Sequence, residues 1–231
     1  MILRNSSKLA IAILLFTGVA CNSGGSSVNK NVDLSTNQDS ISFALGYQNG
    51  DFLAGEGATD FSYDAYIAGF INGIEQNEVL SQDTRNALIN DFRIQLTTKI
   101  KEKNKSEGET FLAENKTKDG VIETASGLQY KVIEEGTGKS PSAESTVEVH
   151  YEGTLIDGTK FDSSYDRGET IEFPLNGVIP GWTEGVQLMK EGATYMFYIP
   201  SNLAYGENPR PGGPIKPNSA LIFKVELVSV K

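Results

Sequence analysis

Aromatic and aliphatic side chains recur between His150 and Phe223 in greater number than one ordinary strand edge needs. The run reads VHYEGTL, KFDSSYDRG, EFPLNGVIPGW, YIPSNLAYG and ALIFKVEL. Two polar side chains, Asp162 and Tyr205, are interleaved with the apolar ones. This composition is typical of an apolar ligand pocket with a few placed hydrogen-bonding groups. The pattern comprises Tyr151, Phe161, Asp162, Arg167, Phe173, Val178, Ile179, Trp182, Tyr205, Ile215 and Phe223.

The chain has few residues for metal or nucleophilic chemistry. Cys21 is the single cysteine, which excludes an intrachain disulfide, and His150 is the single histidine. Zinc sites draw on clustered Cys and His, so we expect no metal and no cofactor. A Ser-His-Asp triad would have to use His150, which sits in an alternating strand pattern. We therefore favour a surface histidine over a general base.

These separated motifs resemble an FKBP-type peptidyl-prolyl cis/trans isomerase domain over residues 127–230. They agree with the family in order and nearly in spacing. The N-terminal half resembles the helical dimerisation segment of the bacterial FkpA/Mip-like branch. The resemblance implies an α+β fold, with a C-terminal antiparallel half-barrel sheet wrapped on one short helix. An all-α N-terminal domain with a long linking helix would precede it.

Matching motif to motif, the resemblance implies a role for each pocket residue. Trp182 would form the floor under the substrate proline, and Tyr205 would donate its hydroxyl. Asp162 would sit near the twisting carbonyl, held by Arg167 and Tyr151. The resemblance implies substrate-binding roles for Phe161, Arg167, Phe173, Val178, Ile179, Ile215 and Phe223, with Ile179 also offering its backbone N–H.

Each of these residues also has a plain structural interpretation. Trp182 and Phe173 could be ordinary core, Asp162 a turn residue and Arg167 a surface charge. The functional interpretation is favoured because all of them coincide with the family's pocket positions. Two positions depart from the family: Gly177 stands where an acid is frequent, and Arg210 where eukaryotic members often carry histidine. Substrate preference and affinity for macrolide inhibitors therefore stay open.

The C-terminal half is rich in β-branched and aromatic runs bounded by Gly, Pro and Asp, which predict strands. We expect strands over residues 128–134, 146–154, 171–173, 194–199 and 220–230, and a tight turn at Asp157-Gly158. Residues 180–190 predict the one short helix, because proline suits a first turn and Gly192 follows the end. Four prolines in residues 207–218 predict a stiff loop over one side of the pocket.

The N-terminal half shows helical spacing of apolar residues from Gln38 and again over residues 63–75. Ser81 is a predicted N-cap of a third, longer helix, which Gly108 would fray or kink. Three such helices bury too little surface alone. A second copy, as the resemblance implies, or the C-terminal domain of the same chain would cover them, and we favour the homodimer. The basic run over residues 99–105 is expected to be a solvated face.

The N-terminus predicts export. Arg4 and Lys8 precede an apolar run over residues 9–20, which is too short to span a bilayer. Gly18-Val19-Ala20-Cys21 resembles a lipobox, with Cys21 lipidated; the alternative is an ordinary cleaved signal. We predict a signal peptide at 1–20, a lipidated linker at 21–35, a helical dimerisation domain at 36–119 and an isomerase domain at 120–231. The protein would be lipid-anchored in the bacterial envelope, on the periplasmic face.

The formal net charge of −10 argues against a nucleic-acid groove, which needs a basic footprint. The resemblance implies an enzyme that isomerises Xaa-Pro bonds of exported proteins during folding. Its partners would be unfolded, proline-containing chains. The alternative is a non-enzymatic chaperone or binding module for unfolded envelope proteins.

Overall fold

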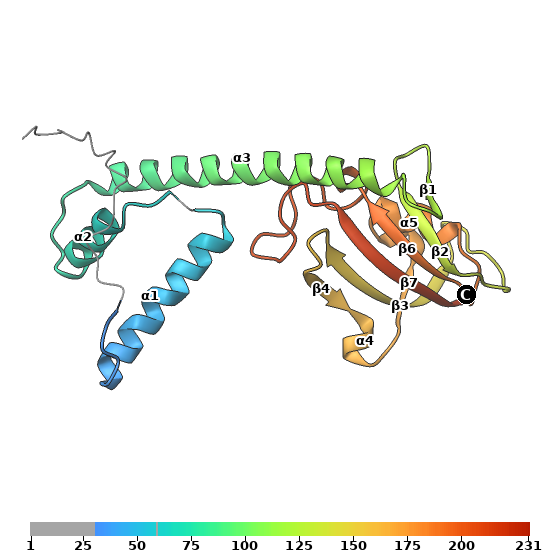
Figure 1. Ribbon diagram of the computed structural model, residues 1–231, viewed down its shortest axis with the longest axis horizontal. Helices are drawn as coiled ribbons and strands as arrows, with labels where there is room; N and C mark the ends of the chain where they lie inside the picture. Colours follow the sequence, from blue (N-terminus) through green and yellow to red (C-terminus); the bar gives the residue numbers. More distant parts are fainter. Residues whose placement is uncertain (1–30, 59) are drawn as a thin grey trace, which may run out of the picture. The chain divides into compact units, whose positions relative to one another are not determined.

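The computed structural model describes residues 31–58 and 60–231, which divide into two compact units (Figure 1). One unit comprises the described part of Met1–Tyr47 together with Asp60–Val79. The other comprises Gln48–Thr59 and Leu80–Lys231. The predicted signal peptide and Cys21 lie outside the described residues. The domain boundaries given above stay predictions.

The predicted N-terminal helices are α1 (Asn37–Gly55), α2 (Tyr63–Ile74) and α3 (Gln82–Asn115). Ser81 caps α3 as predicted, because its hydroxyl accepts a hydrogen bond from the Thr84 N–H at 3.3 Å. Neither α1 nor α2 contains a buried residue. In the part of the chain that the structure describes, no helix has the length and apolarity to cross a membrane.

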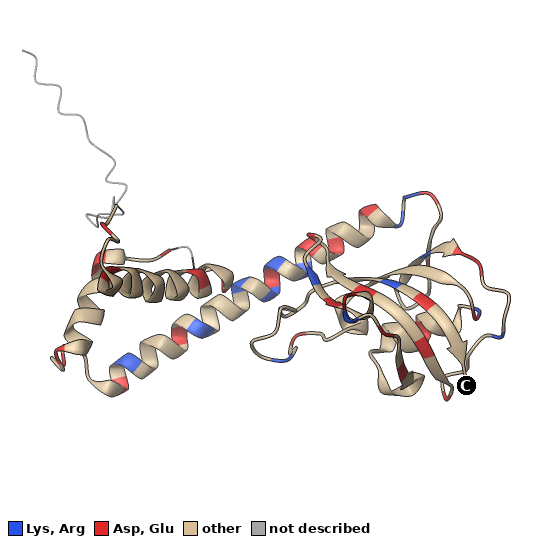
Figure 2. Ribbon diagram, turned by 90° about the horizontal axis from the view of Figure 1, so that it is seen from below, with Lys and Arg blue, Asp and Glu red and all other residues tan. Residues whose placement is uncertain are grey.

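The expectation that Gly108 frays or kinks the third helix is wrong. α3 runs without a break from Gln82 to Asn115, and Gly108 is buried within it. Gly108 faces Ala220, so its missing side chain serves a close tertiary contact and does not end the helix. Figure 2 shows basic and acidic residues mixed along this helix. Lys103 and Lys105 are exposed as expected, whereas Lys101 is half-buried.

The C-terminal half forms one seven-stranded antiparallel sheet in the order β1-β2-β6-β7-β3-β4, with β5 also paired to β3. Four short helices lie between the strands: α4 (Ser164–Arg167), the 3-10 helix η1 (Leu175–Gly177), α5 (Pro180–Gln187) and the 3-10 helix η2 (Ser201–Leu203). The strands are β1 (Val121–Glu123), β2 (Gln129–Glu134), β3 (Thr146–Leu155), β4 (Lys160–Ser163), β5 (Ile171–Pro174), β6 (Thr194–Ile199) and β7 (Leu221–Val230).

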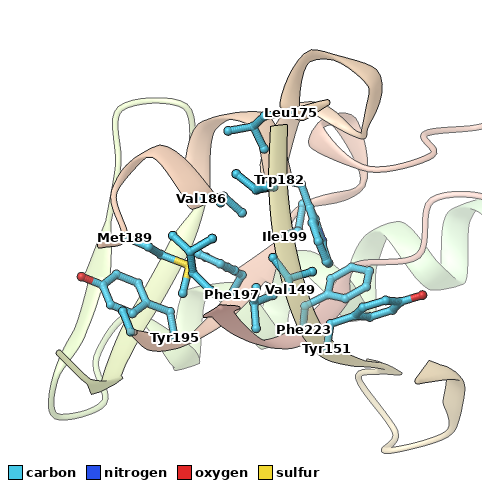
Figure 3. Packing of buried hydrophobic residues seen from close by; sticks show 14 of the residues in the cluster. Val149, Tyr151, Leu175, Trp182, Val186, Met189, Tyr195, Phe197, Ile199 and Phe223 are labelled. Carbon is cyan, nitrogen blue, oxygen red and sulfur yellow. The ribbon is translucent and has the colours of Figure 1, made fainter. Parts of the chain in front are cut away.

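The core lies between the sheet and α5 (Figure 3). Along β3 the side chains of Val147, Val149 and Tyr151 are buried, and the intervening residues are half-buried. This is the predicted two-residue alternation. From α5, Trp182 and Val186 are buried in the same cluster. The predicted α+β fold, a sheet wrapped on one short helix, is confirmed.

Candidate active site

A pocket of about 730 Å³ opens on the C-terminal unit. Its walls come from β3, β4, β5, the start of α5 with the segment leading into it, the start of β7, Tyr205 and residues 207–218, which we call the cover loop. Ten of the eleven residues singled out from the sequence line it: Tyr151, Phe161, Asp162, Phe173, Val178, Ile179, Trp182, Tyr205, Ile215 and Phe223. Arg167 lies behind the lining, in contact with Asp162 and Tyr151.

The indole of Trp182 forms the centre of an aromatic cluster in this pocket (Figure 3). Its ring stands edge-to-face with Phe223 at 5.1 Å and with Tyr151 at 5.4 Å between ring centroids. Phe173 packs against it at 5.5 Å. Such edge-to-face pairs are a favoured geometry for aromatic rings. The side chain is only 5% exposed, so the pocket is lined by a rigid, packed surface.

Gly153 is a pocket determinant that the sequence pattern did not reveal. A Cβ atom at this position of β3 would lie 2.6 Å from the ring of Phe161 and 2.8 Å from that of Phe223. Both rings line the pocket. The two walls can therefore meet edge-to-face, at 5.5 Å between centroids, only because residue 153 has no side chain.

The polar groups of the pocket form one cluster. The Tyr151 hydroxyl donates a hydrogen bond to Asp162, and the Arg167 guanidinium makes an ion pair with the same carboxylate. Arg167 Nη2 also donates to the Tyr151 hydroxyl at 3.0 Å. Both oxygens of the Asp162 carboxylate are thus engaged, which fixes its orientation at the pocket edge. The family resemblance implied that Arg167 and Tyr151 hold Asp162, and these three side chains do contact one another.

Comparison with known proteins places these features in a family. The sequence model of the FKBP-type peptidyl-prolyl cis-trans isomerase matches residues 137–228. A second model, the domain amino terminal to FKBP-type peptidyl-prolyl isomerase, matches residues 38–132. The outer membrane protein MIP of Legionella longbeachae is 41% identical over 207 residues, covering 86% of this chain and 88% of that protein. This chain belongs to the FKBP-type peptidyl-prolyl cis-trans isomerases.

Two further relatives support this membership. The FKBP-type isomerase FkpA of Aeromonas hydrophila is 52% identical over 157 residues, which are 68% of this chain and 57% of that protein. The crystal structure of FkpA from Escherichia coli superposes with a TM-score of 0.64 at 35% identity, covering 86% of this chain and 99% of that one. The family and the enzyme class expected from the sequence are confirmed. The roles of the individual pocket residues remain proposals.

Three titratable side chains in the pocket of this FKBP-type isomerase have pKa values that differ from their ordinary ones. Burial raises the pKa of Asp162, but the hydrogen bonds from Tyr151 and Arg167 outweigh it, so the pKa lies below its ordinary value. Burial, followed by the bond to Asp162, raises the pKa of Tyr151. Burial and the nearby Asp162 charge raise the pKa of Tyr205. At neutral pH the isomerase pocket therefore holds a carboxylate and two neutral phenols.

Two donors of the isomerase pocket are available to a ligand. No described residue accepts a hydrogen bond from the Tyr205 hydroxyl or from the backbone N–H of Ile179. Both residues line the pocket. Ile179 is the N-cap residue of α5, where the first N–H groups lack intrahelical acceptors. The indole N–H of Trp182 is also unpartnered among the described residues, but it is buried away from solvent.

His150 lies outside the pocket lining. Its ring stacks on Tyr165 at 4.7 Å between centroids, and its Nδ1 lies 3.0 Å from the Ser164 hydroxyl. The residue is half-buried, so it is less exposed than the surface histidine we expected. Sequence reasoning left out Ile171, a further pocket residue of the isomerase. Pro209, Gly213 and Pro214 also line the pocket, and they lie in the proline-rich loop that was expected over one side of it.

Proposed function

We propose that this isomerase accelerates cis/trans isomerisation of Xaa-Pro bonds in exported proteins while they fold, by desolvation and hydrogen bonding without a covalent step. The observation that carries the proposal is the pocket itself. It combines a buried indole surface, a fixed carboxylate at Asp162, and donors at Ile179 and Tyr205 that have no acceptor within residues 31–58 and 60–231.

The chemistry follows from the nature of the barrier. Rotation about a prolyl peptide bond costs about 18–20 kcal/mol because the amide loses resonance, and it takes tens to hundreds of seconds unaided. The planar amide is the more charge-separated form. Transfer from water to an apolar pocket weakens that form relative to the twisted one. A rate gain of about 10⁵ needs roughly 7 kcal/mol of binding that favours the twisted state.

We assign roles by position in the pocket. The indole of Trp182 supports the proline ring, and the walls exclude water from the amide. The Ile179 N–H and the Tyr205 hydroxyl donate to substrate carbonyls, which holds the chain on either side of the rotating bond. Asp162 lies near the twisting carbonyl, and Arg167 and Tyr151 keep its carboxylate in place.

A protease-coupled assay on a short Xaa-Pro anilide peptide tests this function with the full chain. The parent protein should accelerate isomerisation, and Trp182→Ala should lower kcat/KM strongly because the floor of the pocket is lost. No acceleration by the folded parent protein would refute the isomerase function. Loss of folding in the variant is checked by its circular dichroism. The same assay with added macrolide tests whether Gly177 and Arg210 permit inhibitor binding.

A second function, holding unfolded envelope proteins, is favoured by the apolar surface of the N-terminal unit. Phe43 is 45% exposed, Phe70 61% and Ile74 70%. We propose that a second copy of the chain covers part of this surface in a homodimer. The cleft between the two copies would then hold client chains. Suppression of aggregation of a denatured protein without prolines measures this function separately from isomerisation.

We also propose lipid anchoring at Cys21 in the bacterial envelope, on the periplasmic face. The support is the lipobox-like sequence and the relative from Legionella longbeachae that is named an outer membrane protein. Two acyl signals suffice for stable anchoring. Mass spectrometry of the mature N-terminus after expression in a bacterial host should show a diacylglyceryl mass on Cys21. The Cys21→Ser variant should lack it and leave the membrane fraction.

A further inference from the structure

The second half of α3 holds both ends of the cover loop. Asn104 Nδ2 donates to the carbonyl oxygen of Pro217 at 2.8 Å, and Asn218 Nδ2 donates to the carbonyl oxygen of Lys101 at 3.2 Å. Lys101 Nζ lies 3.1 Å from Glu207 Oε2 at the other end of the loop. In this ion pair Lys101 is half-buried and Glu207 is exposed; an ion pair in contact with solvent contributes little, so the two amide hydrogen bonds carry the attachment to α3.

The base of the cover loop is closed by Asn218. Its N–H donates to the carbonyl oxygen of Gly206 at 2.8 Å, directly after Tyr205. Its φ is 58°, a left-handed conformation that asparagine tolerates better than most side chains. One residue thus joins the start of the loop to its end and also reaches α3.

The distance between α3 and the exit of the loop is fixed by packing. Gly108 lies one turn after Asn104, and a Cβ at Gly108 would lie 3.2 Å from the Cβ of Ala220, which precedes β7. Farther along, Asn115 donates to Gln129 on β2 at 3.0 Å, and Gln129 donates to the Leu112 carbonyl at 2.8 Å. The helix is therefore held against the sheet on the C-terminal side of the loop contact.

The attached loop forms one side of the pocket, through Pro209, Arg210, Gly213, Pro214 and Ile215. Prolines in the loop fix φ and limit how far its middle can move once its ends are held. We propose that Asn104 and Asn218 are positioning residues of the isomerase, through which α3 sets the place of the cover loop over the substrate. This inference rests on the isomerase activity proposed above.

The test uses the full chain with matched substitutions. Asn104→Asp replaces the donor by an acceptor facing the Pro217 carbonyl. Asn218→Gly keeps the left-handed backbone and removes only the amide that reaches Lys101. Asn90→Asp makes the same chemical change as Asn104→Asp at an exposed position of α3 and serves as the control. Peptide kinetics and amide hydrogen exchange are measured on all four proteins.

Loss of one loop hydrogen bond should raise KM about three- to tenfold and leave kcat within about twofold, because the loop contacts ground and transition states alike. Exchange of the amides in residues 207–216 should quicken in both loop variants, with β3 and β7 unchanged and the control like the parent. Unchanged KM and unchanged loop exchange would overturn the inference. So would exchange that quickens equally across the sheet, which marks general destabilisation.

The two proposals fail in different ways. If the parent protein does not accelerate the peptide, the isomerase function is refuted. The attachment of the loop is then still decided by hydrogen exchange, which needs no turnover. If the parent is active and the loop variants match it in KM and in loop exchange, only the positioning role is refuted.

Discussion

Tyr205 lines the pocket and is 47% exposed, and its hydroxyl has no hydrogen-bond partner among the described residues. Nothing in the fold therefore depends on that oxygen. A hydroxyl that makes no hydrogen bond within the protein is available to donate one to a bound substrate. This separates its contribution from that of Asp162, whose carboxylate is already engaged by Tyr151 and Arg167.

We predict that Tyr205→Phe lowers kcat/KM about three- to tenfold, the worth of one neutral hydrogen bond. The melting temperature should stay unchanged, because no intramolecular bond is lost. Suppression of aggregation should also stay unchanged. Protease-coupled kinetics and a thermal melt on the full chain measure this. An unaltered kcat/KM would show that the hydroxyl does not contact substrate.

The pKa values of the pocket side chains predict how kcat/KM depends on pH. The pKa of Asp162 lies below its ordinary value and those of Tyr151 and Tyr205 lie above theirs. We therefore expect kcat/KM to stay nearly constant around neutral pH and to fall only at pH values below the ordinary pKa of an aspartate, as Asp162 gains a proton. Exchange-based NMR on the peptide measures this without a coupling protease.

The free energy of unfolding should also fall at acidic pH as Asp162 gains a proton. Because the folded-state pKa of Asp162 is lowered, its contribution to the free energy of unfolding is present above the unfolded pKa and is lost as pH falls through the folded value. The side chain is 43% exposed, so this contribution is small. The Asp162→Asn variant should lack this acid-dependent step. An acid limb of the same size in that variant would assign the titration to another group.

Residue types revealed the pocket because aromatic and proline side chains are few and each has a restricted use. Gly153 stayed hidden, since the clash that requires a glycine there involves Phe161 and Phe223, and Phe223 lies seventy residues away. The free N–H of Ile179 stayed hidden from pattern alone for the same reason. Whether a donor has a partner depends on tertiary geometry that spacing does not encode.

At the scale of elements, β3 is the strand on which the pocket depends. It pairs with β4, β5 and β7, and it carries Gly153 opposite Asp162 on β4 and Phe223 on β7. A substitution at Gly153 therefore disturbs the contacts of β3 with both β4 and β7. The close approach at Gly153 makes that dependence testable.

Gly153→Ala should lower the free energy of unfolding by about 1–3 kcal/mol, because the added methyl group overpacks two rings. It should also lower kcat/KM, since the same rings form pocket walls. Urea denaturation and peptide kinetics measure the two effects. Gly158→Ala, in the turn after β3, strains a positive φ without touching the pocket and serves as the control. Full activity and stability in Gly153→Ala would contradict the packing argument.

Strand periodicity predicted most elements closely: β6 spans the expected residues, and β2, β3 and β7 begin or end within a residue of the expectation. Several short elements were not predicted, because three or four residues carry too short a period to be recognised dependably: β1, β4, α4, η1 and η2. The continuity of α3 through Gly108 was predicted wrongly. Local propensity disfavours glycine in a helix by about 1 kcal/mol, and the packing of Gly108 on Ala220 outweighs it.

At the scale of the whole molecule, the two proposed functions depend on separate surfaces. The pocket belongs to the C-terminal unit, and the exposed apolar side chains of α2 belong to the N-terminal one. A substitution on α2 can therefore change association without altering the peptide site. This allows the isomerase and chaperone functions to be measured apart.

We predict that Phe70→Asp halves the molar mass measured by light scattering, because a charge cannot be buried unpaired in an apolar interface. Peptide kcat/KM should stay within about twofold of the parent, while suppression of aggregation weakens. Asn49→Asp, which adds the same charge at an exposed polar position, is the control. A Phe70→Asp protein with the parent's mass would contradict the proposed homodimer.

Trp182 is the only tryptophan in the 231 residues. Because this residue is buried and lines the pocket, the indole emission of the purified protein originates from the pocket alone. The protein thus contains an intrinsic optical reporter. In the purified protein, its emission spectrum can follow ligand binding in real time without any attached dye.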